Sequence, residues 1–195
     1  ISQSRLKPAL QGGVDWSDGP FYIGAWASTI KWIKDAGGGA NVELDLYGGY
    51  KGEIVKDLAF DVGVLGYVYA GHDLTPSPNT TEIYGALTYG PVTAKYSHSV
   101  TNLFGFADSK NSGYVDLSAT FDVAGFAVTP HIGRQTVKKN SGASYTDASL
   151  TISKEVMKGL TLSATVVDTN TGAYVGAGGK DLGKAGFVLG AKFAF

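Results

Sequence analysis

The last residues of the chain read Ala185-Gly186-Phe187-Val188-Leu189-Gly190-Ala191-Lys192-Phe193-Ala194-Phe195. From Phe187 onward every odd position is apolar, and the even positions are mostly small with one charge. Because successive side chains of a strand point to opposite faces, one face of this segment is apolar along its whole length. About ten residues is also the length that a tilted strand needs to cross a bilayer. The segment therefore predicts a membrane-spanning strand with lipid-facing Phe187, Leu189, Phe193 and Phe195, through which barrel-assembly machinery would take up the chain.

The composition agrees with a transmembrane barrel and excludes several other classes. The chain has 195 residues, no Cys and a net charge of −1, so it holds no disulfide or thiolate metal site and lacks the basic face of a nucleic-acid-binding protein. Mean hydropathy is +0.02, and no apolar run approaches the ~18 residues of a membrane helix. In a transmembrane barrel, apolar lipid-facing residues alternate with polar lumen-facing ones, so their hydropathies average to a value of this kind. We expect one all-β domain over residues 1–195, in the bacterial outer membrane and without a cofactor.

Alternation of apolar and polar residues predicts an antiparallel up-and-down β-barrel. The pattern is clearest over residues 42–51, where Val42, Leu44 and Leu46 oppose Glu43 and Asp45. Similar segments lie at 9–16, 21–32, 58–70, 82–89, 92–97, 114–122, 126–133, 147–153, 160–166 and 185–195. Pro130 inside one of these segments predicts a β-bulge, because proline cannot donate to the hydrogen-bond ladder.

The connections alternate in length. Short turns near residues 18, 54, 90, 124 and 157 alternate with longer segments near 36, 75, 106, 140 and 177. Outer-membrane barrels have short periplasmic turns and longer outer loops, so Phe195 should lie on the periplasmic side. Bacterial single-chain barrels have an even number of strands, and the eleven predicted segments therefore suggest about twelve strands with one missing before Ile1. The rival interpretation is that one element is misassigned.

Aromatic residues near the predicted strand ends resemble the two girdles of a membrane barrel. They are Trp16, Trp26, Trp32, Tyr50, Tyr89 and Phe195.

The polar face carries the residues that would act on a solute. Acidic candidates fall in the outer half of the predicted barrel, and the basic ones lie lower or at mid-wall. Rings of like charge set channel selectivity, so an acidic outer vestibule would favour cations; the alternative is that these acids pair with Lys or Arg across the wall. His131 could gate the lumen with pH or could be a plain wall residue. The candidates are Glu43, Asp45, Glu82, Lys95, Asp116, His131, Asp147 and Lys192.

Two functions follow from this pattern, and an enzyme is not expected. The first is a narrow passive channel for ions or small solutes, surrounded by outer-membrane lipid. The second is a structural or interaction barrel whose lumen is plugged. In the second, Leu103, Phe104 and Phe106 form the plug or bind a partner, and an open strand seam invites pairing with another chain or a further copy. No Ser-His-Asp set with informative spacing and no metal-binding spacing are present.

Two motifs resemble a known family. The run Ile1-Ser2-Gln3-Ser4-Arg5-Leu6-Lys7-Pro8-Ala9-Leu10-Gln11-Gly12-Gly13 resembles the N-terminal motif of the TorF family of proteobacterial porins, and Glu43-Leu44-Asp45-Leu46-Tyr47-Gly48-Gly49-Tyr50-Lys51-Gly52 is similar to its second motif. The resemblance extends along the chain and implies an outer-membrane barrel. It also implies that a strand ending near an Arg-Gly pair precedes the first motif.

Overall fold

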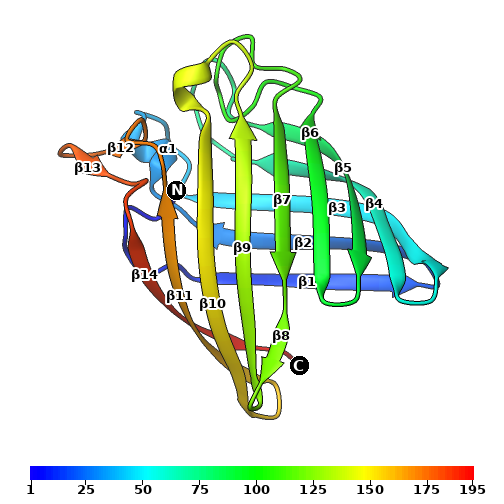
Figure 1. Cartoon of the computed structure of the whole chain (residues 1–195). Helices are drawn as coiled ribbons and strands as arrows, with labels where there is room; N and C mark the ends of the chain where they lie inside the picture. Colours follow the sequence, from blue (N-terminus) through cyan, green and yellow to red (C-terminus); the bar gives the residue numbers. More distant parts are fainter.

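One antiparallel sheet, rolled into an open barrel, makes up most of the protein (Figure 1). The computed structural model describes residues 1–195. Consecutive strands pair with one another, so the topology is up-and-down as predicted. The strands are β1 (Gln11–Asp18), β2 (Phe21–Thr29), β3 (Val42–Val55), β4 (Leu58–Val68), β5 (Thr80–Tyr89), β6 (Val92–Ser99), β7 (Gly113–Ala119), β8 (Phe121–Val123), β9 (Phe126–Thr136), β10 (Tyr145–Met157), β11 (Leu160–Thr169) and β14 (Gly186–Phe193).

Strands β7 and β8 form one long strand that is interrupted opposite Pro130. Ser118 pairs with His131 and Phe121 with Val128, so both strands keep a single register against β9. Proline has no amide hydrogen, and the ladder breaks where that donor is missing. The bulge predicted at Pro130 was wrong, because the pairing of β9 with β10 is also continuous there. Counted this way, the sheet has the eleven long strands that the sequence predicts.

Short turns and long connections lie at opposite ends of the strands, as predicted. The turn end has tight hairpins with left-handed backbone, for example at Gly19 (φ 54°) and Gly90 (φ 53°). Such φ values suit the two-residue turns that match strand twist. At the loop end, β2 stops at Thr29 and Trp32 begins the short helix α1 (Trp32–Asp35), so the strand predicted over 21–32 was too long. The loop end also holds η1 (Ser141–Ala143) and the hairpin of β12 (Val175–Gly176) and β13 (Lys180–Asp181).

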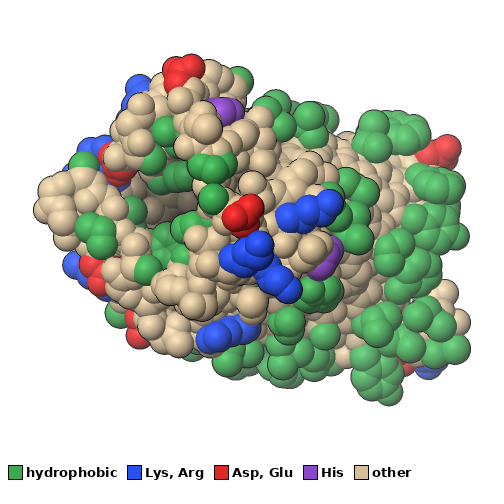
Figure 2. Space-filling view, turned by 90° about the horizontal axis from the view of Figure 1, so that it is seen from above, with side chains coloured by type: hydrophobic (Ala, Val, Ile, Leu, Met, Phe, Trp, Pro, Cys, Tyr) green, Lys and Arg blue, Asp and Glu red, His purple; other side chains and the backbone are tan.

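The outer wall is apolar and the inner wall is polar. Only 21 of 195 residues are buried, and large side chains such as Leu87 (52% exposed) and Ile132 (51% exposed) lie on the outer face. The barrel therefore has no central apolar core of the kind that supports a water-soluble barrel. Hydrophobic side chains cover the strand surface at the right of Figure 2, and most of the charged side chains lie over the loops at the left and centre. No helix is long and apolar enough to cross a membrane.

Most outward-facing aromatic side chains lie at the turn end, although Tyr96 on β6 and Phe187 at the start of β14 are exposed toward the loop end. Trp16, Phe21, Tyr50, Tyr89 and Phe193 are exposed near the hairpins, and the rings of Phe21 and Tyr50 meet edge to face with centroids 5.1 Å apart. Two other members of the predicted girdles lie elsewhere, since Trp26 faces the lumen and Trp32 lies in α1. Phe195, just after β14, is exposed and stacks on Phe193 at the turn end.

Strands β1 and β14 are the two edges of the sheet, and no backbone pairing joins them. Both strands run from the loop end to the turn end, so their directions are parallel (Figure 1). A twelfth strand between them would have to run the opposite way to extend the antiparallel order on both sides. That strand stays a prediction.

The inner wall contains a repeated contact that spans three strands. In each case a tyrosine lies across a glycine of the next strand, and its hydroxyl donates a hydrogen bond to an aspartate one strand further on. We call these contacts Tyr–Gly–Asp units; they are Tyr22–Gly49–Asp61 (Oη to Oδ1 2.5 Å), Tyr47–Gly24–Asp15 (2.5 Å) and Tyr114–Gly133–Asp147 (Oη to Oδ2 3.0 Å). A Cβ at Gly133 would lie 1.9 Å from Tyr114 Oη, so only glycine fits beneath the ring.

We predict that Gly133→Ala destabilises the barrel by about 1–3 kcal/mol, because Tyr114 must leave its place on the wall. Gly85→Ala is the control, since the nearest atom to its added Cβ is 3.8 Å away. Denaturant unfolding of the refolded protein in detergent measures both variants. In a Tyr114→Ala background the cost of Gly133→Ala should largely disappear. Equal costs for the two glycine variants would show that the units do not constrain the wall.

Candidate functional site

All eight charged candidates from the sequence lie on the inner face of the sheet. The placement follows from register: Asp45 on β3 is directly opposite Trp26 and Tyr67, and Lys95 on β6 is directly opposite Asp116 on β7. Asp15, Lys51 and Asp61 share this face. Acidic side chains therefore outnumber basic ones along the lumen. The inward acids include Asp15, Glu43, Asp45, Asp61, Glu82, Asp116, Asp122 and Asp147, and the inward bases are Lys51, Lys95, Lys192 and His131.

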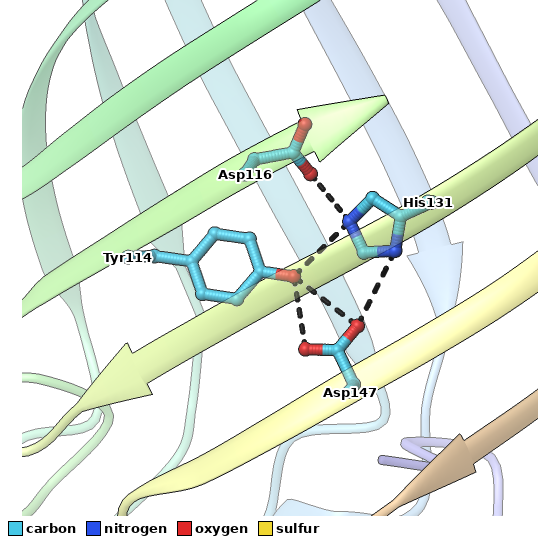
Figure 3. Close-up of polar contacts among 4 residues, drawn as sticks. All are labelled: Tyr114, Asp116, His131 and Asp147. Carbon is cyan, nitrogen blue, oxygen red and sulfur yellow. Dashed lines mark hydrogen bonds and ion pairs between the residues drawn. The ribbon is translucent and has the colours of Figure 1, made fainter. Parts of the chain in front are cut away.

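His131 is the centre of a four-residue cluster on β7, β9 and β10 (Figure 3). Its Nε2 lies 2.5 Å from Asp116 Oδ2, and its Nδ1 lies 3.6 Å from Asp147 Oδ1. The hydroxyl of Tyr114 donates to Asp147 and lies 3.4 Å from His131 Nε2. The sequence predicted Asp116, His131 and Asp147 as separate wall candidates. The register of β7, β9 and β10 brings them together. His131 therefore lies within reach of two carboxylates at this point of the wall.

The remaining lumen acids have no ion-pair partner. The only ion pairs on the inner wall are those of His131, so the predicted alternative of pairing with Lys or Arg is not observed. Although Lys95 faces Asp116 in register, its Nζ lies 4.1 Å from the centroid of the Tyr84 ring. Lys51 Nζ likewise lies 5.2 Å from the centroid of Tyr22. The two lysines thus contact tyrosine rings, and the carboxylate charge of the wall is left largely uncompensated.

The acids nearest the loop end are covered. Glu43 is 6% exposed and accepts a hydrogen bond from Tyr69 Oη (2.5 Å), and Glu82 is 5% exposed. Asp45 is half-buried, and its Oδ1 is inaccessible and has no hydrogen-bond partner in the protein. The predicted outer vestibule is therefore roofed at Glu43 and Glu82. Lys192, near the free edge of β14, is exposed.

The long connections pack together into a loop cap, made of residues 30–41, 69–79, 100–112, 137–144 and 170–185. One buried cluster joins Ile30, Ile33, Ala40 and Tyr69, and a second joins Leu103, Val137 and Ala143. Phe104 packs against both clusters. Leu103 is 1% exposed, and Phe106 packs edge to face against Tyr174. The apolar cluster of the 101–112 loop therefore faces into the cap.

Residues 1–7 lie across the cap and tie two loops together. The carbonyl of Gln3 accepts from the amides of Lys31 (2.8 Å) and Trp32 (3.2 Å), and the Ser2 amide donates to the Leu182 carbonyl (2.9 Å). Arg5 forms an ion pair with Asp35 at the end of α1. In the same loop as Leu182, the Tyr174 hydroxyl donates to the Ala143 carbonyl (2.7 Å), and burial raises the pKa of Tyr174 to about 12. The cap is therefore a packed structure and not a set of separate loops.

Neither catalytic nor metal chemistry has an assembled site in the lumen. Ser118 and Ser149 are directly opposite His131 on the two neighbouring strands, but neither hydroxyl is hydrogen-bonded to its imidazole. No group of three or more His, Asp or Glu side chains is placed to hold a metal ion.

Comparison with known proteins places the chain in a family and defines its fold class. The chain belongs to the family of bacterial proteins of unknown function named Gcw_chp, whose model matches residues 1–195. This family model carries no porin name, so the TorF likeness stays a resemblance of motifs. No curated protein matches the sequence significantly.

Two solved structures are similar to this chain. The NanC porin superposes with a TM-score of 0.61 at 12% identity, over 96% of this chain and 99% of that one. OccAB3 of Acinetobacter baumannii gives a TM-score of 0.47 at 13% identity, over 96% of this chain and 55% of that one. The first likeness shows that the fold is that of a porin barrel.

We predict that Leu103→Ala loosens the cap while leaving the barrel folded. Removing a buried leucine side chain costs about 2–5 kcal/mol, and here that loss falls on the loops. Hydrogen exchange should show faster exchange of the amides of residues 100–112 and unchanged protection of β3 and β4. Leu117→Ala, at an outward position of the same residue type that is 47% exposed, should leave the loop amides unchanged. Equal exchange in the two variants would contradict a packed cap.

Proposed function

We propose that this protein forms a narrow, cation-preferring channel across the bacterial outer membrane. The observation that carries the proposal is the inverted distribution of side chains, with large hydrophobic residues exposed outside and ionisable residues inside. A water-soluble protein rarely exposes a contiguous apolar surface of this extent. Lipid would cover that surface, and the aromatic side chains at the turn end would lie at one membrane interface.

The inner wall supports passage of small solutes. Barrels of eight strands are filled by side chains, whereas those of sixteen or more enclose open channels; eleven long strands lie between. The Tyr–Gly–Asp units keep three large rings against the wall, where they take least space from the lumen. Uncompensated carboxylates within low-dielectric walls concentrate cations, and lumen charge sets selectivity.

Charge substitutions at the His131 cluster and at Lys95 should shift ion preference in opposite directions. In a planar bilayer under a KCl gradient, Asp116→Asn and Asp147→Asn should each move the reversal potential toward that of a less cation-selective pore. Lys95→Gln should move it the other way. Asp168→Asn removes the same charge from an exposed position on the outer face of β11 and serves as control. If the reversal potential is the same in all four variants, wall charge does not set selectivity.

The loop cap supports a second function, that of a plugged barrel with a structural or binding role. Buried Leu103 and Tyr69 support this alternative, because they belong to clusters in which the loops pack on one another, although Figure 2 shows the surface hollowed between loops at the left of the view.

Replacing residues 102–110 by a short Gly-Ser linker separates the two functions in single-channel recordings. A plugged barrel predicts no steady conductance from the natural chain and a steady conductance from the shortened one. A channel predicts that the natural chain already conducts and that the linker raises its conductance. Steady conductance from the natural chain would eliminate the plugged barrel.

We also propose that β14 is the segment through which barrel-assembly machinery takes up the chain. Phe187, Leu189 and Phe193 project from its outer face and are strongly exposed, as a lipid-facing terminal strand requires.

A further inference from the structure

The outer face of the sheet changes from apolar to polar at one level across β6, β7, β9 and β10. Register places Tyr96 on β6 directly opposite Val115 on β7, and Val115 directly opposite Arg134 on β9. Arg134 is in turn directly opposite Thr146 on β10, and its Nη1 donates to the Thr146 hydroxyl (2.9 Å). We call these four residues the outer row. From the outer row toward the turn end, the outward residues of β9 are all apolar: Ile132, Pro130, Val128 and Phe126.

The outer row lies at the distance from the turn end that a membrane interface requires. Phe126 begins β9 at the turn end and is exposed, and the strand rises about 26 Å from there to Arg134. This length is comparable with the apolar band of ~25 Å that surrounds outer-membrane barrels. Tyr96 is exposed in the same row, and tyrosine is enriched at membrane interfaces.

Basic side chains gather at and above the outer row. Arg134, Lys110 and Lys138 are exposed, and none of them forms an ion pair. The two lysines belong to adjoining loops, since the Lys138 amide donates to the Ser112 hydroxyl (2.9 Å). Asp108 is the only acidic residue of the 100–112 and 137–144 loops. Figure 2 shows Lys and Arg side chains gathered near the centre of the view, where the loops meet the hydrophobic strand surface.

Hydrogen bonds connect the interface tyrosine to one of these loops. Tyr96 lies across Gly113 of β7, where an added Cβ would be 2.6 Å from the tyrosine Oη. The same Oη lies 3.2 Å from His98 Nδ1, and His98 Nε2 lies 3.2 Å from Asn111 Oδ1. Asn111 directly follows Lys110 in the chain. The loop that carries this lysine is therefore held against the outer edge of the wall.

An apolar groove lies directly below the outer row on the outer wall. It has a volume of about 420 Å³. The groove exists because Gly85 and Ala94 have little or no side chain, whereas their neighbours in register, Tyr96 and Leu87, are large. A hydrocarbon chain would bury apolar surface there without displacing any polar partner. The large side chains around it are Phe60, Val62, Leu87, Tyr96 and Val115.

We propose that this face binds a phosphorylated lipid of the outer leaflet. Arg134, Lys110 and Lys138 contact the phosphate, and an acyl chain occupies the groove below Val115. Guanidinium and ammonium groups are the usual partners of phosphate, and the positive charge above an apolar groove follows the order of headgroup and chain in a lipid. The proposal rests on the membrane location given under the proposed function, but it does not require that the lumen conducts.

Native mass spectrometry of the refolded full chain in nonionic detergent, titrated with diphosphoryl lipid A, tests the site. We expect saturable binding. Arg134→Gln and Lys138→Gln should each weaken it about fivefold, which is the effect of one basic residue near an anionic lipid surface. Together they should weaken it about twenty-five-fold if the two side chains act independently. Lys34→Gln removes the same charge from an exposed position in α1 and should bind like the natural chain.

Two further measurements separate a lipid from a free anion. Gly85→Leu fills the groove and should weaken lipid A binding, whereas Gly66→Leu makes the same change at an outward position of β4 outside the groove and should not. Inorganic phosphate at an equal concentration should leave lipid A bound, because it has no chain to place in the groove.

Folding of each variant is checked by the heat-dependent mobility shift of barrels on SDS gels. If Arg134→Gln does not fold, Lys138→Gln gives the same comparison from an exposed loop. The proposal is overturned by equal affinities in the charge variants and Lys34→Gln, by equal affinities in the two leucine variants, or by displacement with inorganic phosphate. Lipid A binding by a barrel that is silent in bilayers would retain the site and reject the channel; steady conductance without lipid A binding would do the reverse.

Discussion

The inner wall depends on a steric constraint: a tyrosine can cross a neighbouring strand only where that strand presents glycine. Tyr22 crosses β3 at Gly49, and the adjacent Gly63 of β4 lets Tyr84 approach from the other side, so that the two hydroxyls meet. Each crossing adds a side-chain link across three strands to their backbone hydrogen bonds. It also places the ring parallel to the wall, where it takes little room from the lumen. The aspartates that end the Tyr–Gly–Asp units are held by these hydroxyls and stay on the lumen surface.

Aromatic residues outside the Tyr–Gly–Asp units differ in their role at the two ends of the barrel. At the turn end they point outward and form a belt around the hairpins, including Phe21 and Tyr50. At the loop end Trp32, Tyr69, Phe104 and Tyr174 pack into the cap instead. The loops are long enough to fold over the mouth, and they contain the only substantial buried apolar clusters of the protein. Stability is therefore distributed between the sheet ladder and the cap, and the lumen between them is free to carry polar groups.

Local alternation predicted the strands well because the two environments of the wall differ so strongly. The acids at positions 43, 45, 82, 116 and 147 were assigned to the lumen from period alone, and the register places them there.

Alternation within one strand could not show which residues of the neighbouring strands lie beside these acids. Gly133 lies diagonally from Tyr114, and Trp26 faces Asp45 from a strand whose period was ambiguous. Such neighbours depend on register between strands, which the sequence of one strand does not encode. Inward tyrosines beside inward glycines were the one signal that could have identified the units. The helix at Trp32 and the packing of Leu103 depend on loops meeting at the barrel mouth, a tertiary effect that overrides local pattern.

The charge of the lumen follows from the same geometry. A lysine on a barrel wall usually finds a carboxylate across the strand, and Lys95 has Asp116 directly opposite. Asp116 is instead engaged by His131, which two carboxylates share, and the ammonium of Lys95 lies over the ring of Tyr84. That ring is in reach because Gly63 gives it space on the wall. Where a positive side chain contacts an aromatic ring, its charge still repels cations, but it no longer cancels one particular carboxylate. Asp45 and Asp61 therefore have no ion-pair partner along the path that a solute would follow, and the glycines that admit the rings are an indirect cause of the acidic lumen.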